Sequence, residues 1–161
     1  MPDWKLLKAT YSLRIFSLWK IPLIALVRPK LLALDAQRCV VRLPLTWLTR
    51  NHIGSMYFGA LSIGADVSGG LIVMNLIQAK SSRVTFLFKD VQANFLKRAE
   101  GDVVFTCEDG EKLQALLAKA EATGERVDDT VSIIATVPTL LQDEPVAEFR
   151  MTISLKQYPP K

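Results

Sequence analysis

A chain of 161 residues, half of them hydrophobic and 22% charged, is long enough for one hydrophobic core and too apolar to be disordered. The mean hydropathy of +0.22 is high for a soluble protein, so apolar surface must be buried in a large core, a subunit interface or a lipid contact. The net charge of +4 is modest, and one histidine with two cysteines outside any CxxC pattern argues against a zinc site, so no metal is expected.

The first 30 residues are basic and predict two helices. They carry six lysine or arginine residues against one acidic residue, Asp3. Apolar side chains recur at intervals of three and four over residues 3–19, as in an amphipathic helix, and Pro22 opens a second helix over residues 21–27. We favour a solvated basic face over a contact with anionic lipid, nucleic acid or a phosphorylated ligand. The helically spaced apolar residues are Trp4, Leu7, Tyr11, Ile15 and Leu18.

The next segment predicts a strand followed by a long helix. Residues 34–45 alternate apolar and polar side chains, which predicts a strand of about ten residues. Residues 54–77 predict the helix, with Asn51 at its N-cap or just before it. This helix is long enough to span a bilayer, which takes ~20 residues. Asp66 near its middle and the many Gly, Ser and Ala residues favour a helix buried in a protein core.

Residues 83–124 predict two strands and a helix. Residues 83–98 read as one long strand that bends near residues 89–91, and residues 101–109 return after a turn at Gly101-Asp102. Residues 110–124 predict a helix with Asp109 as its N-cap and Gly124 as its stop.

The C-terminal segment predicts two antiparallel strands, over residues 129–139 and 145–158, joined by a turn. A sheet of five or more strands with one apolar face needs a cover, and the long helix of small residues is the element available. The order of elements therefore predicts an α+β fold in which an antiparallel sheet wraps a central helix.

The stretch "NHIGSMYFGALSIGAD", residues 51–66, resembles a motif of the hotdog-fold thioesterases, in particular the phenylacetate-type acyl-CoA thioesterases and a poorly characterised branch of that superfamily. That group carries Asn, two residues, Gly, two residues, His-Gly-Gly, and an acidic residue seven positions later. Here Tyr57 and Phe58 replace His-Gly, while the spacing is kept. The matching positions are Asn51, Gly54, Tyr57, Phe58, Gly59 and Asp66.

The resemblance covers residues 31–156 and implies a single hotdog domain over residues 31–161. Residues 1–30 lie outside the resemblance and are expected to form amphipathic helices packed on that domain. It also implies an acyl-CoA thioesterase that assembles as a homodimer or a dimer of dimers, with pockets at the subunit interface. Coenzyme A would enter as part of the substrate, and no separate cofactor is expected. Residues 94–103, "NFLKRAEGDV", are similar to the family's third-strand pattern and make Lys97 and Arg98 candidates for binding the coenzyme A phosphates, unless they are ordinary solvated cations.

Thioester hydrolysis needs a polarised carbonyl and a positioned nucleophile. Unpaired N–H groups at the first turn of the long helix, around Phe58 and Gly59, can stabilise an oxyanion. Gly59 and Asp66 share one helix face, because seven residues return to within about 20° of the starting azimuth. Asp66 would act as general base or as nucleophile, with a pKa raised by its apolar setting, and Asn51 would orient the water or the carbonyl.

Each of these residues also has a structural interpretation. The Asp66 carboxylate can be satisfied by hydrogen bonds from Ser62, Ser68 or a strand. Asn51 can be a helix cap, and Tyr57 can either fill the core or line the pocket with its hydroxyl.

The alternative function is a hotdog protein that binds an acyl group or lipid without turnover. Attachment to a membrane surface through the N-terminal helices, with Trp4, Phe16 and Trp19 facing lipid, is compatible with either function. No signal peptide and no nucleic-acid-binding pattern is evident, so a cytoplasmic protein with two buried thiols, Cys39 and Cys107, is expected.

Overall fold

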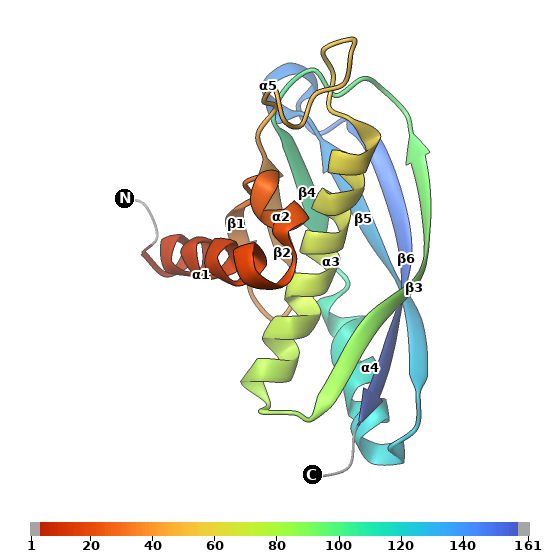
Figure 1. The fold of residues 1–161 in the computed structure, drawn as a ribbon. Coiled ribbons are helices and arrows are strands. Elements are labelled where there is room, and N and C mark those ends of the chain that lie inside the picture. The colour runs from red at the N-terminus through yellow and green to blue at the C-terminus, as the bar shows by residue number, and fades with distance from the viewer. Residues whose placement is uncertain (1–3, 158–161) are drawn as a thin grey trace.

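A six-stranded antiparallel sheet curves around helix α3 in the computed structural model, which describes residues 4–157 (Figure 1). The strand order is β1-β2-β4-β5-β6-β3. This is the predicted α+β hotdog architecture, with additional helices at the N-terminus. The helices are α1 (Trp4–Lys20), α2 (Pro22–Leu26), α3 (Phe58–Ala79), α4 (Gly110–Thr123) and α5 (Pro138–Leu141). The strands are β1 (Lys30–Leu34), β2 (Cys39–Leu43), β3 (Val84–Phe95), β4 (Val103–Cys107), β5 (Val127–Thr136) and β6 (Pro145–Gln157).

Helix α3 lies in the concave face of the sheet because its small residues admit the strands' large side chains. A Cβ added to Gly64 would lie 2.3 Å from the ring of Phe105, a fully buried residue of β4. Among the described residues, α3 is the one helix long and apolar enough to cross a bilayer, and 61% of its most apolar window is buried inside the protein. That burial agrees with the expected core helix.

The predicted start of this helix is wrong by four residues. Residue Tyr57 is its N-cap and Phe58 its first residue, so residues 54–57 lie outside the helix. Gly54 adopts a φ of +89°, a left-handed conformation that cannot continue an α-helix. Asn51 therefore caps no helix.

Two features of the sheet differ from the sequence prediction. The segment predicted as one strand over residues 34–45 instead holds the last residue of β1, a turn and β2, and β1 and β2 pair as a hairpin. The turn forms because the carboxylate of Asp35 accepts hydrogen bonds from the N–H groups of Gln37 (2.8 Å) and Arg38 (2.9 Å). Strand β4 does not return along β3. It pairs with β2 and β5, while β3 pairs with β6.

The other local predictions are confirmed. Strand β3 shifts register at Lys89, within the predicted bend, and β5 and β6 are antiparallel neighbours. Asp109 is the N-cap residue of α4, and Gly124 ends that helix at a φ of +66°. The segment predicted as a turn between β5 and β6 contains the short helix α5.

Both cysteines lie in the middle of the sheet. Cys39 on β2 is directly opposite Cys107 on β4, and both are fully buried free thiols, as the sequence predicted. Burial raises the pKa of Cys107 to about 11 and that of Cys39 further. Neither thiol is therefore a nucleophile at neutral pH.

Candidate active site

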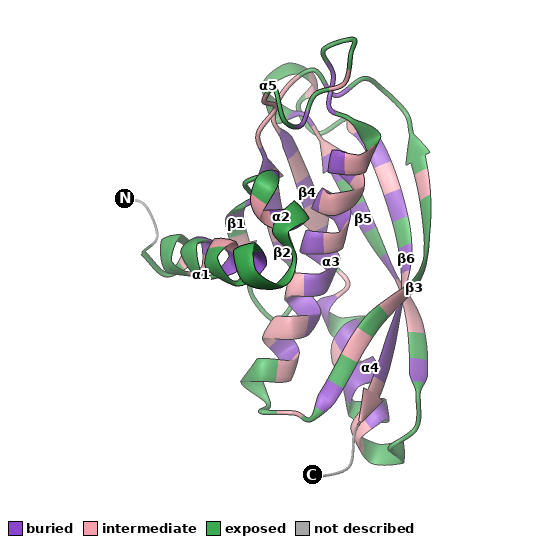
Figure 2. Cartoon of the chain, in the orientation of Figure 1, coloured by how far each residue is buried: buried purple, intermediate pink, exposed green. Residues whose placement is uncertain are grey.

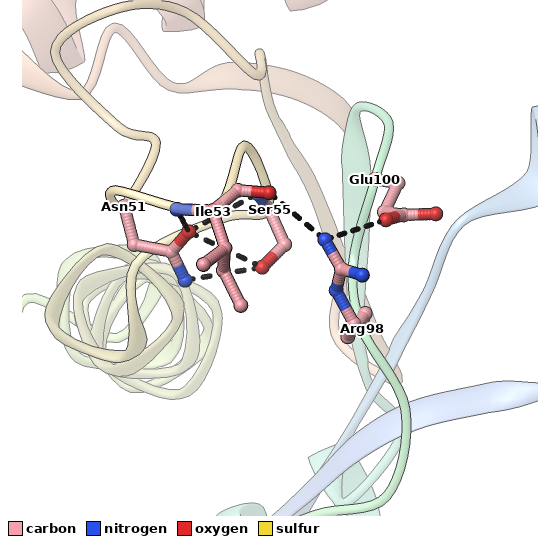
Figure 3. Close-up of polar contacts among 5 residues, drawn as sticks. All are labelled: Asn51, Ile53, Ser55, Arg98 and Glu100. Atoms are coloured by element: carbon pink, nitrogen blue, oxygen red, sulfur yellow. Dashed lines mark hydrogen bonds and ion pairs between the residues drawn. The ribbon is translucent and has the colours of Figure 1, made fainter.

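Asn51 organises the loop that precedes α3 (Figure 3). Its side-chain oxygen accepts hydrogen bonds from the N–H groups of Ile53 (3.0 Å) and Ser55 (3.2 Å), and its amide nitrogen donates to the Ser55 hydroxyl (3.0 Å). Arg98 fixes the same loop from the end of β3 by donating to the Ile53 carbonyl (2.8 Å), while it pairs with Glu100 (2.9 Å). The amide of Asn51 is thus engaged within its own loop.

The residues at the His-Gly-Gly position form the start of α3. The rings of Tyr57 and Phe58 are 4.6 Å apart, and Phe58 contacts Phe95 on β3 at 6.3 Å between centroids. A Cβ added to Gly59 would lie 2.5 Å from Cε1 of Tyr57. The tyrosine ring therefore occupies the space that the missing side chain of Gly59 leaves open. Tyr57 is 48% exposed, which excludes the core-filling interpretation.

Asp66 lies two turns further along α3 and lines a cavity of about 480 Å³. The other walls of the cavity come from α1, α2, β1 and β3, and most of its lining is apolar. Its volume falls within the range of about 300–1,000 Å³ that is typical of small-molecule sites. Tyr57, Phe58 and Gly59 do not line it. The polar lining residues are Ser12, Ser17, Asp66, Asn75 and Gln78.

The Asp66 carboxylate has no hydrogen bond or ion pair with any residue in the range 4–157. The two serines that could have satisfied it are engaged elsewhere. Ser62 donates to the Phe58 carbonyl (3.0 Å) and Ser68 to the Ala65 carbonyl (3.1 Å), both within α3. Desolvation in this partly buried position raises the pKa of the Asp66 carboxyl above its ordinary value of 3.8. The geometry therefore excludes both serines as partners of the carboxylate.

We expect this carboxylate to destabilise the folded protein at neutral pH. Because its pKa is higher in the folded than in the unfolded chain, its contribution to stability is complete below the unfolded pKa and is lost as pH rises through the folded pKa. Asp66→Asn carries no charge, so its melting temperature should exceed that of the wild type at neutral pH. The difference should shrink as pH falls through the raised folded pKa and be smallest below about 4, where the carboxyl is protonated in both states. Thermal unfolding across pH measures this, and a difference that is constant with pH would contradict it.

The two basic candidates lie on the surface after β3 and are engaged with carboxylates. Lys97 pairs with Glu144, and Arg98 pairs with Glu100. All four side chains are about half exposed, so these pairs contribute little to stability. Among the described residues, no group of three or more His, Cys, Asp or Glu side chains could hold a metal ion.

Sequence reasoning missed the contribution of the N-terminal helices to this site. Leu13, Phe16 and Ser17 of α1 line the Asp66 cavity, although the resemblance began only at residue 31. The Ser17 hydroxyl is buried and has no hydrogen-bond partner among the residues that the structure describes. No signal in the sequence indicated Ser17, because it lies outside the apolar stripe predicted for residues 3–19. Its unpaired O–H leaves a donor for a ligand in the cavity.

A family model described as a domain of unknown function, DUF4442, matches residues 11–154 of the chain. Among solved structures, PA5026 from Pseudomonas aeruginosa, a protein of unknown function described as a probable thioesterase, is similar at 25% identity and a TM-score of 0.77 over 92% of this chain and 96% of that chain. A search of curated proteins finds no match.

Two further solved structures show the fold alone. A protein of unknown function from Chlorobaculum tepidum, OLEI01261, has 13% identity and a TM-score of 0.81, over 95% of this chain and 97% of that chain. A mutant of the thioesterase enzyme SAV0944 from Staphylococcus aureus has 16% identity and a TM-score of 0.64, over 84% of this chain and 98% of that chain. Thioesterase-like proteins thus share the hotdog fold of this chain.

Proposed function

Since the chain belongs to the family of the domain of unknown function DUF4442 and has a thioesterase-like hotdog fold, we propose that it hydrolyses acyl-coenzyme A thioesters. The proposed location of this reaction is the cytoplasm. One observation carries the proposal: a carboxylate with a raised pKa, and with no partner among residues 4–157, lines an apolar cavity of ligand size. Structural carboxylates in such settings are normally hydrogen-bonded, whereas catalytic ones are kept free for the substrate.

In the proposed reaction, Asp66 takes a proton from a water molecule as the water oxygen attacks the thioester carbonyl carbon. The tetrahedral intermediate then collapses, the carbon–sulfur bond breaks, and the thiolate takes up a proton, which leaves a carboxylic acid and the coenzyme A thiol. As nucleophile, Asp66 would instead attack the carbonyl carbon and displace the coenzyme A thiolate, which takes up a proton. Water would then cleave the resulting acyl anhydride to release the carboxylic acid and regenerate Asp66. Both routes require an ionised Asp66.

The developing oxyanion needs donors close to the same carbon. The N–H groups of Phe58 and Gly59 at the start of α3 are suitable, but seven residues of helix place them ~10 Å along the axis from Asp66 of the same chain. A reacting carbonyl must lie ~3 Å from both groups. We therefore propose a homodimer, or a dimer of dimers, in which one subunit supplies Asp66 and the other the helix start. Asn51 would act there by holding the loop before the helix.

The inner face of β3 offers a surface for this dimer. Beyond the register shift at Lys89, β3 curves away from α3 (Figure 1), and Val91 and Phe95, opposite the buried Met151 and Ala147 of β6, are 56% and 49% exposed. Phe58 lies beside them and is 58% exposed. Apolar side chains on the core-facing side of a sheet are expected to be covered.

We expect Val91→Glu to weaken the dimer at least about a hundredfold, because each copy would bury an unpaired charge. Sedimentation velocity over a range of concentrations measures the dissociation constant. Leu140→Glu, an equally exposed position on α5, is the matched control and should leave it unchanged. A wild-type protein that remains monomeric at high concentration would contradict the dimer.

Lys97 and Arg98 are proposed to bind the coenzyme A phosphates by exchanging their present glutamate partners. Together with Tyr57, Phe58 and Gly54, which shape the loop and the helix start, they would form the substrate-binding surface outside the cavity. A peripheral contact with a membrane surface does not follow from hydrolysis and depends on the N-terminal helices alone.

The second candidate function is binding of an acyl group without turnover, and the tyrosine ring over Gly59 favours it. The experiment that separates the two measures thiol release from acyl-coenzyme A esters of increasing chain length and from aryl esters. Turnover by the wild type supports the hydrolase. Absence of turnover across this panel, with an acyl ligand retained in the purified protein, would establish the binding role instead.

A further inference from the structure

Helix α1 presents its apolar stripe to the outside of the protein. The residues Trp4, Tyr11 and Leu18 are 68%, 70% and 63% exposed. The side that packs on the fold carries Thr10, Leu13 and Ser17 instead. A helix on a soluble protein normally buries its apolar stripe and exposes its polar side. Here the stripe predicted from the sequence is the uncovered one, and Figure 2 shows most of α1 as exposed.

This orientation is fixed by specific contacts. The Thr10 hydroxyl accepts a hydrogen bond from the N–H of Leu31 (3.1 Å) on the edge strand β1. The Arg14 guanidinium donates to the carbonyls of Pro29 (3.2 Å) and Arg28 (3.3 Å). Rotating α1 to bury its apolar stripe would break all three hydrogen bonds, so the exposed stripe belongs to the docked position of the helix.

The apolar surface continues onto α2. Ten of the 22 large apolar side chains that are exposed within residues 4–157 fall in the segment from Trp4 to Leu26. Soluble monomers rarely leave so much contiguous apolar surface uncovered. We call these ten residues the N-terminal apolar surface: Trp4, Leu7, Tyr11, Ile15, Phe16, Leu18, Trp19, Ile21, Leu23 and Leu26.

The charge around this surface favours an anionic binding partner. The sequence from Trp4 to Leu34 contains six basic residues and no acidic one. Lys8 lies over the Trp4 ring at 5.7 Å, and Lys8, Arg14, Lys20, Arg28 and Lys30 have no carboxylate partner among the described residues. A second copy of the chain would bring these cations against one another across a two-fold axis. An anionic surface would neutralise them.

We propose that α1 and α2 dock the protein on an anionic lipid bilayer, with the N-terminal apolar surface in the interfacial layer and the lysines and arginines at the headgroups. Trp and Tyr favour this layer, and a helix that combines apolar and cationic side chains lies in it. Helix α1 does not span the bilayer, because its 17 residues include four cations and a span needs ~20 apolar residues.

The same helices connect the bilayer to the proposed chemistry. Their inner sides, through Leu13, Ser17 and Ile24, form one wall of the cavity that Asp66 lines, and two half-exposed members of the N-terminal apolar surface, Phe16 and Ile21, also line it. If the proposed function holds, the wall formed by these helices is what separates the bilayer from Asp66 and from the acyl chain bound in the cavity. Docking itself requires no hydrolysis.

The test is co-sedimentation of the full chain with vesicles of phosphatidylcholine, and of phosphatidylcholine and phosphatidylserine in equal parts. We expect the wild type to bind the mixed vesicles, and high salt to weaken this binding. Lys20→Gln should bind them with about fivefold lower affinity, because each basic residue near an anionic surface raises the affinity by about a factor of five. Trp19→Ala, at a position 82% exposed and outside the cavity, should weaken binding about tenfold or more. Trp47→Ala is the matched control, since Trp47 is 76% exposed but lies outside α1 and α2.

Equal sedimentation with both kinds of vesicle, or equal binding by Trp19→Ala and wild type, would overturn the proposal. A shift in oligomeric state in Trp19→Ala without a change in vesicle binding would overturn it in favour of a second copy. Thiol release from a soluble short-chain acyl-coenzyme A without vesicles tests the hydrolase separately. Trp19→Ala should retain that activity at the wild-type level if the wild type has it.

Discussion

Asp66→Asn is expected to lower kcat/KM for acyl-coenzyme A hydrolysis by about 10²–10⁴-fold, the usual contribution of a positioned acid or base. The amide has almost the same shape as the carboxylate and cannot accept a proton or attack a carbonyl. Since no hydrogen bond or ion pair within residues 4–157 depends on this carboxylate, the variant should fold. Initial rates of thiol release, with thermal unfolding of the same samples, make the comparison.

The pH dependence of the wild type adds a second criterion. Both proposed routes need the ionised carboxylate, so kcat/KM should rise with pH through the raised pKa of Asp66 and level off above it. Asp143→Asn makes the same chemical change at an exposed surface position and should leave rate and profile unaltered. An Asp66→Asn variant that is folded, more stable at neutral pH and as active as the wild type would exclude Asp66 from the chemistry.

Gly64→Ala is expected to lower the free energy of unfolding by about 1–2 kcal/mol. The new methyl group would lie 2.3 Å from the ring of Phe105, which is fully buried. Overpacking of this kind costs about 1–3 kcal/mol and occasionally more. The better helix propensity of alanine offsets only about 1 kcal/mol of it. Urea denaturation measures the difference.

Gly69→Ala is the control within the same helix. Its added methyl group would meet Ile133 and Phe88 at 3.6 Å, an ordinary contact, so this variant should be as stable as the wild type or more stable. Phe105→Leu combined with Gly64→Ala should recover part of the loss if the ring is its cause. Equal stabilities of the two alanine variants would show that the close approach of α3 to β4 does not limit packing.

The sequence predicted the elements whose signals are local. The small residues of α3, the Asp109 and Gly124 ends of α4 and the alternation of β6 each lie within one element, and the structure has all of them. The helix start was misplaced because the Asn51 side chain supports a turn just where the apolar run begins. Strand order, the cavity and the outward stripe of α1 depend on segments far apart in the chain, and periodicity carries no information about such contacts.

Strand β3 shows why the alternation of apolar and polar residues alone does not predict which side chains face the core. The register shift at Lys89 means that Phe86 and Phe88 are followed on the inner face by Val91 and Phe95. Strict alternation from Phe88 would have placed Asp90, Gln92 and Asn94 there. One extra residue therefore lets a single strand cover its own helix with one half and offer an apolar surface with the other.

The facing cysteines at the centre of the sheet bear on how hydrolysis is assayed. Thiol-reactive dyes that detect released coenzyme A respond to thiolate, and both protein thiols are buried and protonated at neutral pH. The native protein therefore adds no background colour. Slow labelling of Cys39 or Cys107 would instead count the molecules whose central strands β2 and β4 have separated, so the same dye gives an internal measure of unfolding.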